Sequence, residues 1–446
     1  MRQRSRWLRL LAVLLGLSML AAACGDDDNT EASDGNTSDK TSGDNIEQVA
    51  TEVGDAAPSC TGDSDGVLKV GGLLPQTGSL AFLGPPEEAG ANLAVNDINA
   101  AGGVLGKPIE YSPGDSGDTS TDIATQTVNR HLNEGSDMIL GAASSAVSFT
   151  VIDAISGACK IEFSPANTSP DFTTYDDGDL YFRTAPADIL QGRVMAELVA
   201  EDGYGSLALL ALQDPYGEGL LKYTKQPFEE GGGDVVLDEF YDPQATNFSA
   251  EVDDVIAKDP DALVLIGFDE SSKILTELFE KGFTPDKKGV YLVDGNIGNA
   301  TGEDFASTPG ALVGVKGTFP SAEVSQDFKN KLLGVDPALI DFIYGPETYD
   351  AVVITALAAE AAGTDDPAKI ATKINGITRD GEKCTSFTQC RDLIKAGTTD
   401  IDYDGPSGPQ TFSKAGEPTE ASFAIQAYGA DNKIDDSLTQ YRAASL

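Results

Sequence analysis

A regular alternation of short apolar segments with amphipathic segments, from residue 67 onward, most constrains the fold of this chain. The segments LKVGGLLP (68–75) and SLALLAL (206–212) are nearly continuous apolar runs, as expected for strands buried on both faces of a parallel sheet. Segment 87–101 carries apolar residues at helical spacing and is followed by Gly102 and Gly103. Because strand–helix alternation of this kind produces parallel sheets with right-handed crossovers, we predict an α/β protein.

Two such α/β series follow one another, each about 120 residues long. The expected strands of the two series lie at 68–75, 109–111, 137–141 and 160–164, and at 206–212, 234–241, 262–267 and 290–294. A long alanine-rich helix (347–362) and a late strand (423–428) are expected near the C-terminus. Residues 66–446 are too many for one hydrophobic core, so the sequence predicts two domains.

The N-terminus has the pattern of a signal peptide. It begins with four arginines (Arg2, Arg4, Arg6 and Arg9), followed by the uncharged apolar run 10–23. This run is shorter than the roughly 20 residues of a membrane-spanning helix, so residues 1–23 are predicted to be a signal peptide. Three alanines lead to Cys24, which resembles a bacterial lipobox, although Ala21 stands where leucine is usual. We expect an extracytoplasmic protein anchored to the cell membrane by a lipid on Cys24, with cleavage alone as the alternative.

Residues 24–65 are rich in Asp, Ser, Thr and Gly and poor in large apolar side chains. Such a segment buries too little surface to offset its ordering entropy, so we predict a disordered tether. As a flexible chain its ends would lie about 35 Å apart. A lipid and a tether keep a soluble body near a membrane without a spanning helix.

The charge balance limits the classes of partner. The chain has 30 Lys and Arg against 72 Asp and Glu, a net charge of −42. Removal of residues 1–23, which hold four arginines and no acid, makes it more acidic still. Nucleic acids and anionic lipid surfaces require basic patches, so we expect no nucleic-acid partner and membrane contact only through the lipid anchor.

Four cysteines follow Cys24, an even number that suggests two disulfides in an exported chain. Cys384 and Cys390 flank TSFTQ and can close a small loop. By elimination, Cys60 then pairs with Cys159. The chain has no CxxC motif and a single histidine, so we expect no metal site built from Cys and His.

Catalytic and cofactor motifs are missing from the sequence. It has no G-x-S-x-G nucleophile elbow, no P-loop and no G-x-G-x-x-G segment. We therefore predict a protein that is not an enzyme and has no cofactor, and an exported hydrolase is the weakest alternative.

Several segments resemble the leucine/isoleucine/valine-binding proteins, which are receptors of ABC importers with the type I periplasmic-binding fold. In chain order they are LKVGGLLPQTGSLAFLG (68–84), GANLAVNDINAAGGVLGKPIE (90–110), ILGAASS (139–145), FSPANTSPDFT (163–173), YFRTAP (181–186), DPYGEGL (214–220), NFSAEVDDVIAKDPDALVLIGF (247–268) and YGPETYDAVVITALAAEAAG (344–363). Each segment alone is weak evidence for the family, but the segments together, in the order and at the spacing of the family, indicate it.

The resemblance implies two Rossmann-like lobes with parallel-sheet cores, joined by three crossovers and closing on a small molecule. The N-terminal lobe would hold residues 66–186 and about 315–418. The C-terminal lobe would hold residues 187–314 and about 419–446. The implied partners are a small amino-acid-like ligand of the branched-chain class and an ABC permease, with the binding protein a monomer. A short amide or urea as ligand, and a ligand sensor for a separate partner, are the alternatives.

The GAASS segment (141–145) ends an expected strand and opens a helix, where the electropositive helix end suits a ligand carboxylate. Ser145, with Ser144 beside it, matches the ligand-binding serine of the family. The alternative is that Ser145 only caps its own helix.

Three further positions match polar ligand contacts of the family. Ala166 would offer its backbone carbonyl to a ligand ammonium, and Thr168 would supply a hydroxyl and an N–H. Asp294, at the end of VYLVD (290–294), matches the ammonium-binding carboxylate. The alternatives are a Pro-bounded turn at 164–170 and, for Asp294, one of many solvated acids.

Aromatic and apolar positions complete the implied pocket. Tyr216 and Phe268 match aromatic wall positions, which can shield a zwitterion from water. Leu83 stands where the family often has an aromatic residue. Ordinary core packing is the alternative for Tyr216 and Phe268. For Leu83, the alternative is that the neighbouring Phe82 is the family's aromatic residue, shifted by one position in register.

Overall fold

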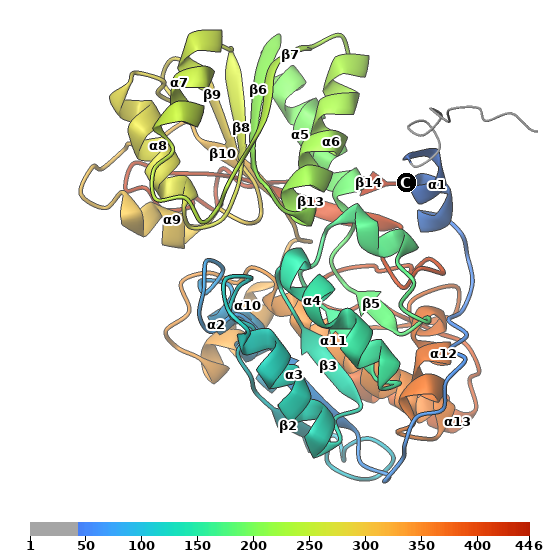
Figure 1. Cartoon of the computed structure of the whole chain (residues 1–446). Coiled ribbons are helices and arrows are strands. Elements are labelled where there is room, and N and C mark those ends of the chain that lie inside the picture. Colours follow the sequence, from blue (N-terminus) through green and yellow to red (C-terminus); the bar gives the residue numbers. More distant parts are fainter. Residues whose placement is uncertain (1–42) are drawn as a thin grey trace, which may run out of the picture. The chain divides into compact units, whose positions relative to one another are not determined.

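Two β-sheets with helices on their faces organise this chain (Figure 1). The computed structural model describes residues 43–446. The expected signal peptide, Cys24 and the first part of the expected tether lie outside these residues. The sheets consist mainly of parallel strands joined through helices, so the predicted α/β class with two parallel-sheet units is confirmed.

The first sheet has five parallel strands in the order β2-β1-β3-β4-β5. Its strands are β1 (Lys69–Leu73), β2 (Glu110–Ser112), β3 (Met138–Gly141), β4 (Ile161–Ser164) and β5 (Tyr181–Arg183). Helices α3 (Ile123–Glu134) and α4 (Ser145–Gly157) contact each other, while α2 (Gly84–Ala100) contacts α10 (Gln326–Val335) and α11 (Gly345–Ala362). Helices α12 (Pro367–Ile377) and α13 (Phe387–Ala396) pack on α11, and β11 (Glu382–Cys384) pairs with β12 (Ile401–Tyr403). We call this sheet with its helices the first lobe.

The second sheet has seven strands in the order β14-β13-β10-β9-β8-β6-β7. Its strands are β6 (Ser206–Leu212), β7 (Asp234–Tyr241), β8 (Ala262–Ile266), β9 (Gly289–Leu292), β10 (Lys316–Pro320), β13 (Glu420–Ala427) and β14 (Gln440–Ser445). Strand β13 is antiparallel to both of its neighbours. Helices α5 (Asp188–Glu201) and α6 (Pro215–Glu230) pack together, as do α7 (Ser249–Lys258) and α8 (Ser271–Glu280), and α9 (Asn299–Asp304) follows β9 (Figure 1). We call this sheet with its helices the second lobe.

The chain passes between the two sheets three times: after β5, after β10 and before β13. The expected boundary near residue 314 places β10 with the first sheet. Instead β10 pairs with β9 and β13, so it belongs to the second sheet and the chain leaves that sheet after Pro320. Strand pairing, which a local apolar pattern does not specify, decides where this strand belongs.

Local sequence signals explain where several helices begin. Asp214 accepts a hydrogen bond from the Gly217 N–H at 2.8 Å, and Pro215 occupies the first turn of α6, where its missing N–H costs nothing. Helix α3 ends at Gly135, which has a φ of 79° in the left-handed region. Strand β6 is buried along almost its whole length, as its unbroken apolar sequence predicts.

Residues 43–65 differ from the expected disordered tether. They contain helix α1 (Gly43–Ala50), in which Ile46 and Ala50 are buried, and Ala56 is buried further along. A few small apolar residues, backbone hydrogen bonds and one cysteine hold the segment against the folded chain, and composition alone does not reveal such contacts. Of the expected tether, only residues 24–42 lie outside the described part of the chain. No helix of the described residues has the length and apolar character of a membrane span.

Both cysteine pairs that the sequence predicts lie close together in the structure. The Cα atoms of Cys60 and Cys159 are 5.9 Å apart, and those of Cys384 and Cys390 are 5.3 Å apart. Both separations fall within the range that disulfide geometry requires. The pair Cys60–Cys159 joins the N-terminal segment to the turn between α4 and β4.

We therefore expect two disulfides in the exported protein. Digestion without reductant, followed by mass spectrometry, should recover one peptide pair that links Cys60 with Cys159 and one that contains Cys384 and Cys390. A thiol-alkylating reagent should modify none of these four residues before reduction. Alkylation of any of them in the folded, unreduced protein would contradict the pairing.

Several carboxyl groups are buried or half-buried, and the loss of solvation raises their pKa values. The pKa rises to about 6 for Asp177, to about 7 for Asp137, Asp214 and Asp350, and to about 8 for Glu347. Between pH 5 and pH 8 the folded state therefore holds more protons than the unfolded state. A native state that binds more protons loses stability as the pH rises.

The free energy of unfolding should fall by at least about 2 kcal/mol between pH 5 and pH 8. Repulsion within a chain of net charge −42 acts in the same direction. Urea titrations followed by circular dichroism at fixed ionic strength measure this change. A urea midpoint that is constant or higher at pH 8 would show that these carboxyl groups titrate as if exposed.

Candidate ligand-binding site

All eight ligand-contact residues predicted from the sequence line a single cavity. Its walls are Leu80, Leu83, Ala143, Ser144, Ser145, Ala166, Thr168, Tyr216, Phe268, Asp294, Gly295 and Tyr344. They come from both lobes, so the cavity lies where the lobes meet. Its volume is about 20 Å³, close to the space of one water molecule. A larger ligand therefore requires the walls to move apart.

The two serines at the start of α4 have different roles. The Ser144 Oγ accepts a hydrogen bond from the Val147 N–H at 3.4 Å, so Ser144 is the N-cap of the helix. The alternative that Ser145 caps α4 is therefore wrong. The Ser145 Oγ instead accepts the Ser169 N–H at 3.3 Å, which leaves its own proton available for an acceptor in the cavity.

The loop that follows β4 carries Ala166 and Thr168, and its neighbours hold it in place. The Ser164 Oγ accepts the backbone N–H groups of Ala166 and Asn167 at 3.2 and 2.9 Å. The Asn167 side chain donates to the Ala143 carbonyl at 2.9 Å, which connects this loop to the loop before α4. Both loops therefore present their backbone groups to the cavity in a fixed arrangement.

Arg183 fixes the same loop from the opposite side. Its Nη1 donates to the carbonyls of Asn167 and Ser169 at 3.2 and 2.8 Å, on either side of Thr168. The buried Thr168 hydroxyl has no hydrogen-bond partner among the described residues. A buried hydroxyl without a partner is costly, so this oxygen is suited to a polar group of a ligand.

Asp294 lies two residues after β9 and is 4% exposed. Its Oδ1 accepts hydrogen bonds from the Gln191 Nε2 and the Tyr216 hydroxyl, both at 2.8 Å. Its Oδ2 accepts one from the Tyr344 hydroxyl, also at 2.8 Å. An ionised carboxylate offers about four acceptor positions, so about one remains for a ligand.

A second buried carboxyl group, Asp188, lies near Asp294. Burial raises the pKa of both groups, and the charge of Asp294 raises the pKa of Asp188 further. Three hydrogen-bond donors oppose the rise in the pKa of Asp294, whereas the nearby Thr168 side chain and the charge of Arg183 oppose the larger rise in the pKa of Asp188. Of the two groups, Asp294 is therefore the one that ionises more readily.

Apolar side chains close the rest of the cavity. The rings of Tyr216 and Phe268 are stacked, with centroids 5.6 Å apart and an interplanar angle of 11°. Leu80 and Leu83, just before α2, are both buried on the first-lobe side. Leu83 thus lines the cavity even though it departs from the aromatic residue expected from the family.

The residues that support Asp294 are not among those predicted from the sequence. Tyr344 lies in the segment YGPETYDAVV that carries part of the family resemblance, but no local pattern connects it to an acid 50 residues away. Its φ of 59° places it in the left-handed region at the start of α11. Gln191 and Asp188 lie on the first turn of α5, and only the sheet packing brings them to β9.

Within residues 43–446, no group of three or more His, Cys, Asp or Glu side chains could hold a metal ion. The only histidine of the chain, His131, is buried, and its Nε2 lies 2.8 Å from the Gly72 carbonyl oxygen. The polar groups of the cavity are one carboxylate, five hydroxyls from two serines, one threonine and two tyrosines, and backbone groups. This set suits a small zwitterion better than a metal.

A family model described as periplasmic binding protein matches residues 67–432. The chain belongs to this family. The Leu/Ile/Val-binding protein homolog 2 of Brucella abortus is 30% identical over 328 residues, which cover 70% of this chain and 83% of that protein. The resemblance that the sequence segments indicate is therefore confirmed, and the family consists of solute-binding proteins rather than enzymes.

Another relative is named for signal transduction. The chemotactic signal transduction system substrate-binding protein BasB of Halobacterium salinarum is 25% identical over 363 residues, covering 79% of this chain and 84% of that protein.

Solved structures share the fold at lower sequence identity. The branched-chain amino acid transporter substrate-binding protein LivJ of Streptococcus pneumoniae, in complex with isoleucine, has a TM-score of 0.70 at 22% identity and covers 85% of this chain and all of that one. A solute-binding protein of an R. palustris ABC transporter, in complex with 4-hydroxybenzoate, has a TM-score of 0.68 at 16% identity and covers 82% and 95%. Both matches show the type I periplasmic-binding fold.

The substitution Tyr344→Phe removes one donor from the buried carboxylate of Asp294. Because hydrogen bonds to charged groups contribute about 1.5–3 kcal/mol, the free energy of unfolding should fall by that amount at pH 7. The loss should shrink at lower pH as Asp294 becomes protonated. Urea denaturation at several pH values measures both effects.

Tyr428→Phe is a control for pH dependence, because its buried hydroxyl donates to the Gly298 carbonyl at 2.9 Å and accepts the Gly298 N–H at 3.1 Å, both neutral groups. Its cost should therefore be independent of pH over the same range. Equal pH profiles for the two variants would argue against an ionised Asp294.

Proposed function

We propose that this protein is the extracytoplasmic solute-binding component of an ABC importer and binds a small amino acid with an apolar side chain. The observation that carries the proposal is the pairing of one buried carboxylate, Asp294, with a helix N-terminus and two hydroxyls in the same cavity. This arrangement complements both charges of a zwitterion.

The head group would bind through groups of both lobes. The ligand ammonium would donate to the remaining acceptor position of Asp294 and to the Ala166 carbonyl. The ligand carboxylate would accept from the Ser145 and Thr168 hydroxyls at the positive end of α4. Each ligand charge then meets a partner that the protein already holds in place.

The apolar walls support a branched-chain ligand. Leu80, Leu83 and Phe268 offer carbon surface and few polar groups to a ligand side chain. Burial of aliphatic carbon there contributes about 25 cal/mol for each Å² removed from water. The names of the Brucella relative and the isoleucine complex agree with this class of ligand. A short amide or urea lacks the full charge pair that the cavity complements.

Binding would be coupled to closure of the lobes. A ligand that contacts residues of both lobes binds the closed arrangement better and shifts the population towards it. We propose that the closed form is recognised by an ABC permease, and that a lipid on Cys24 keeps the protein at the membrane after the signal peptide is removed.

Ligand sensing for a separate partner is a second candidate function. The observation that favours it is the chemotactic role in the name of the Halobacterium relative. Both functions use the same ligand site and the same closure. They differ in the partner that recognises the closed form, so a copurified permease or a copurified signalling protein distinguishes them.

The substitution Asp294→Asn should weaken binding of L-isoleucine by tens-fold or more, because removal of one partner of a buried charge pair costs about 2–5 kcal/mol. Isothermal titration calorimetry of the parent and the variant measures this loss. The parent should bind 4-hydroxybenzoate weakly, because this acid has no ammonium to compensate Asp294. Relative to L-isoleucine, Asp294→Asn should bind 4-hydroxybenzoate better than the parent does.

Asp253→Asn is the control, since this acid on α7 has a side chain that is 69% exposed and does not line the cavity. It should bind L-isoleucine as the parent does. Unchanged L-isoleucine affinity in Asp294→Asn would overturn the proposed head-group contacts. If the parent binds 4-hydroxybenzoate more tightly than any amino acid, the ligand class is wrong.

A further inference from the structure

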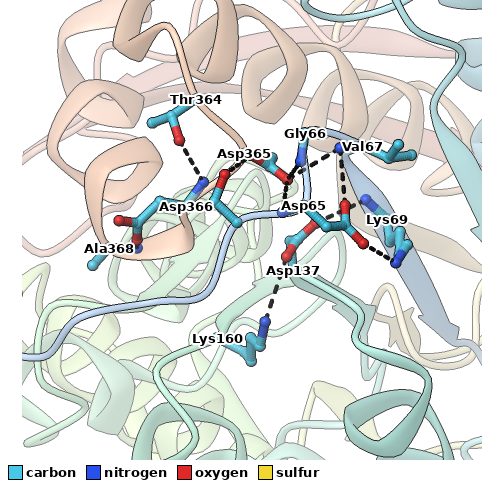
Figure 2. A network of polar contacts seen from close by, with 11 residues as sticks. Asp65, Gly66, Val67, Lys69, Asp137, Lys160, Thr364, Asp365, Asp366 and Ala368 are labelled. Carbon is cyan, nitrogen blue, oxygen red and sulfur yellow. Dashed lines mark hydrogen bonds and ion pairs between the residues drawn. The ribbon is translucent and has the colours of Figure 1, made fainter.

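The segment 43–67, which we call the N-terminal strap, is attached to the first lobe along most of its length. At its C-terminal end, the Asp365 carboxylate accepts the backbone N–H groups of Asp65, Gly66 and Val67 and the Ser64 hydroxyl, as Figure 2 shows for the backbone contacts. Asp365 lies between α11 and α12, so this end of the strap is fixed to the first lobe.

The middle of the strap has further contacts with the same lobe. The Asn375 side chain donates to the Gly54 carbonyl at 3.1 Å, and Arg379 pairs with Asp55 at 2.7 Å. The Lys414 N–H donates to the Glu52 carbonyl. The Cys60–Cys159 pair adds a covalent attachment when oxidised. From Glu52 onward, the strap therefore moves with the first lobe.

The N-terminal end of the strap contacts the other lobe. Ile46 on α1 is 7% exposed and packs in one apolar cluster with Ala187, Ile189 and Tyr223. Ile189 and Tyr223 belong to α5 and α6, which cover the second sheet. Ala187 lies on the first passage of the chain between the lobes. Helix α1 also contacts the short 3₁₀ helix η1 (Pro170–Thr174) of the first lobe.

The lobes touch each other directly beside this cluster. A Cβ atom on Gly219 of α6 would lie 2.5 Å from the Pro170 side chain at the start of η1, so glycine permits this close approach. Gly219 is one helical turn before Tyr223 on the same face of α6. Helix α1 thus covers a seam at which the lobes meet.

We infer that the N-terminal strap restrains the opening of the two lobes and favours their closed arrangement. Residues 47–51 connect the contact of Ile46 with the second lobe to the first-lobe contacts that begin at Glu52, and α1 itself also contacts η1 of the first lobe. The six residue steps from Ile46 to Glu52 span at most about 20 Å when fully extended, and less while α1 stays helical. Wide opening at the seam therefore requires Ile46 to leave its cluster.

The strap would act on ligand affinity without touching the ligand. The apparent dissociation constant equals the intrinsic one divided by the fraction of protein in the closed, binding-competent form. If one isoleucine is buried only in the closed form, the equilibrium constant between the open and the closed form changes by about tenfold or more. This consequence rests on the lobe closure proposed above, whereas the restraint itself can be measured without ligand.

The test compares two substitutions in the strap of the full mature chain. Ile46→Asp should release α1 from α5 and α6, while Val53→Asp, at a position that is 70% exposed, should change nothing. Small-angle X-ray scattering without ligand should give a larger radius of gyration for Ile46→Asp than for the parent and for Val53→Asp. Circular dichroism verifies that all three proteins are folded.

A second variant keeps the side chains with which the strap contacts both lobes. Insertion of Gly-Ser-Gly-Ser between Thr51 and Glu52 lengthens the connection and should also increase the ligand-free radius of gyration, even if Ile46→Asp fails to fold. In L-isoleucine titrations, Ile46→Asp should raise the dissociation constant about threefold to tenfold. Ligand-free radii equal to the parent's in the insertion variant and in any folded Ile46→Asp would overturn the restraint. A larger radius without L-isoleucine binding in any protein would preserve the restraint and contradict the proposed ligand.

Discussion

The buried ion pair between Arg183 and Glu417 holds together the parts of the chain on which the cavity depends. Arg183 ends β5, at the first passage between the lobes, and Glu417 lies just before β13, at the third. Both side chains are at most 1% exposed, and the remaining guanidinium donors hold the carbonyls on both sides of Thr168. Because an uncompensated buried charge costs about 3–5 kcal/mol, neither partner can be removed without disturbing the crossovers and the ligand loop together.

The placement of charge also determines which ligands the cavity can bind. The chain is strongly acidic, yet only one carboxylate in the cavity carries the donors that stabilise its ionised form, and three of its acceptor positions are filled by Gln191, Tyr216 and Tyr344. The pKa of Asp188 nearby is raised further, by burial and by the charge of Asp294. Negative charge is therefore concentrated at one place, where a single ligand cation can compensate it, and a ligand without a cation leaves it uncompensated.

The small volume of the cavity gives the lobe contacts a direct role in binding. A cavity of about 20 Å³ admits an amino acid only if its walls separate, and its walls belong to both lobes. Contacts at the seam, such as Gly219 with Pro170 and Ile46 with Tyr223, therefore contribute to the same equilibrium as the ligand. The N-terminal segment takes part in this equilibrium although its composition resembles that of a linker.

The sequence by itself determined the strand–helix order and the family, because apolar periodicity and short motifs are local properties, and the resemblance to the family then pointed to the eight residues that line the cavity. Ser145, Ala166 and Asp294 could be placed at strand ends for that reason, and the carboxyl ends of parallel strands meet at one edge of a sheet. Only the tertiary structure decided that β10 joins the second sheet, that Ser144 rather than Ser145 caps α4, and that Tyr344 and Gln191 support Asp294. It also decided that residues 43–65 pack against the folded chain. Each of these outcomes depends on contacts between residues far apart in the chain, and a local sequence pattern carries no information about such contacts.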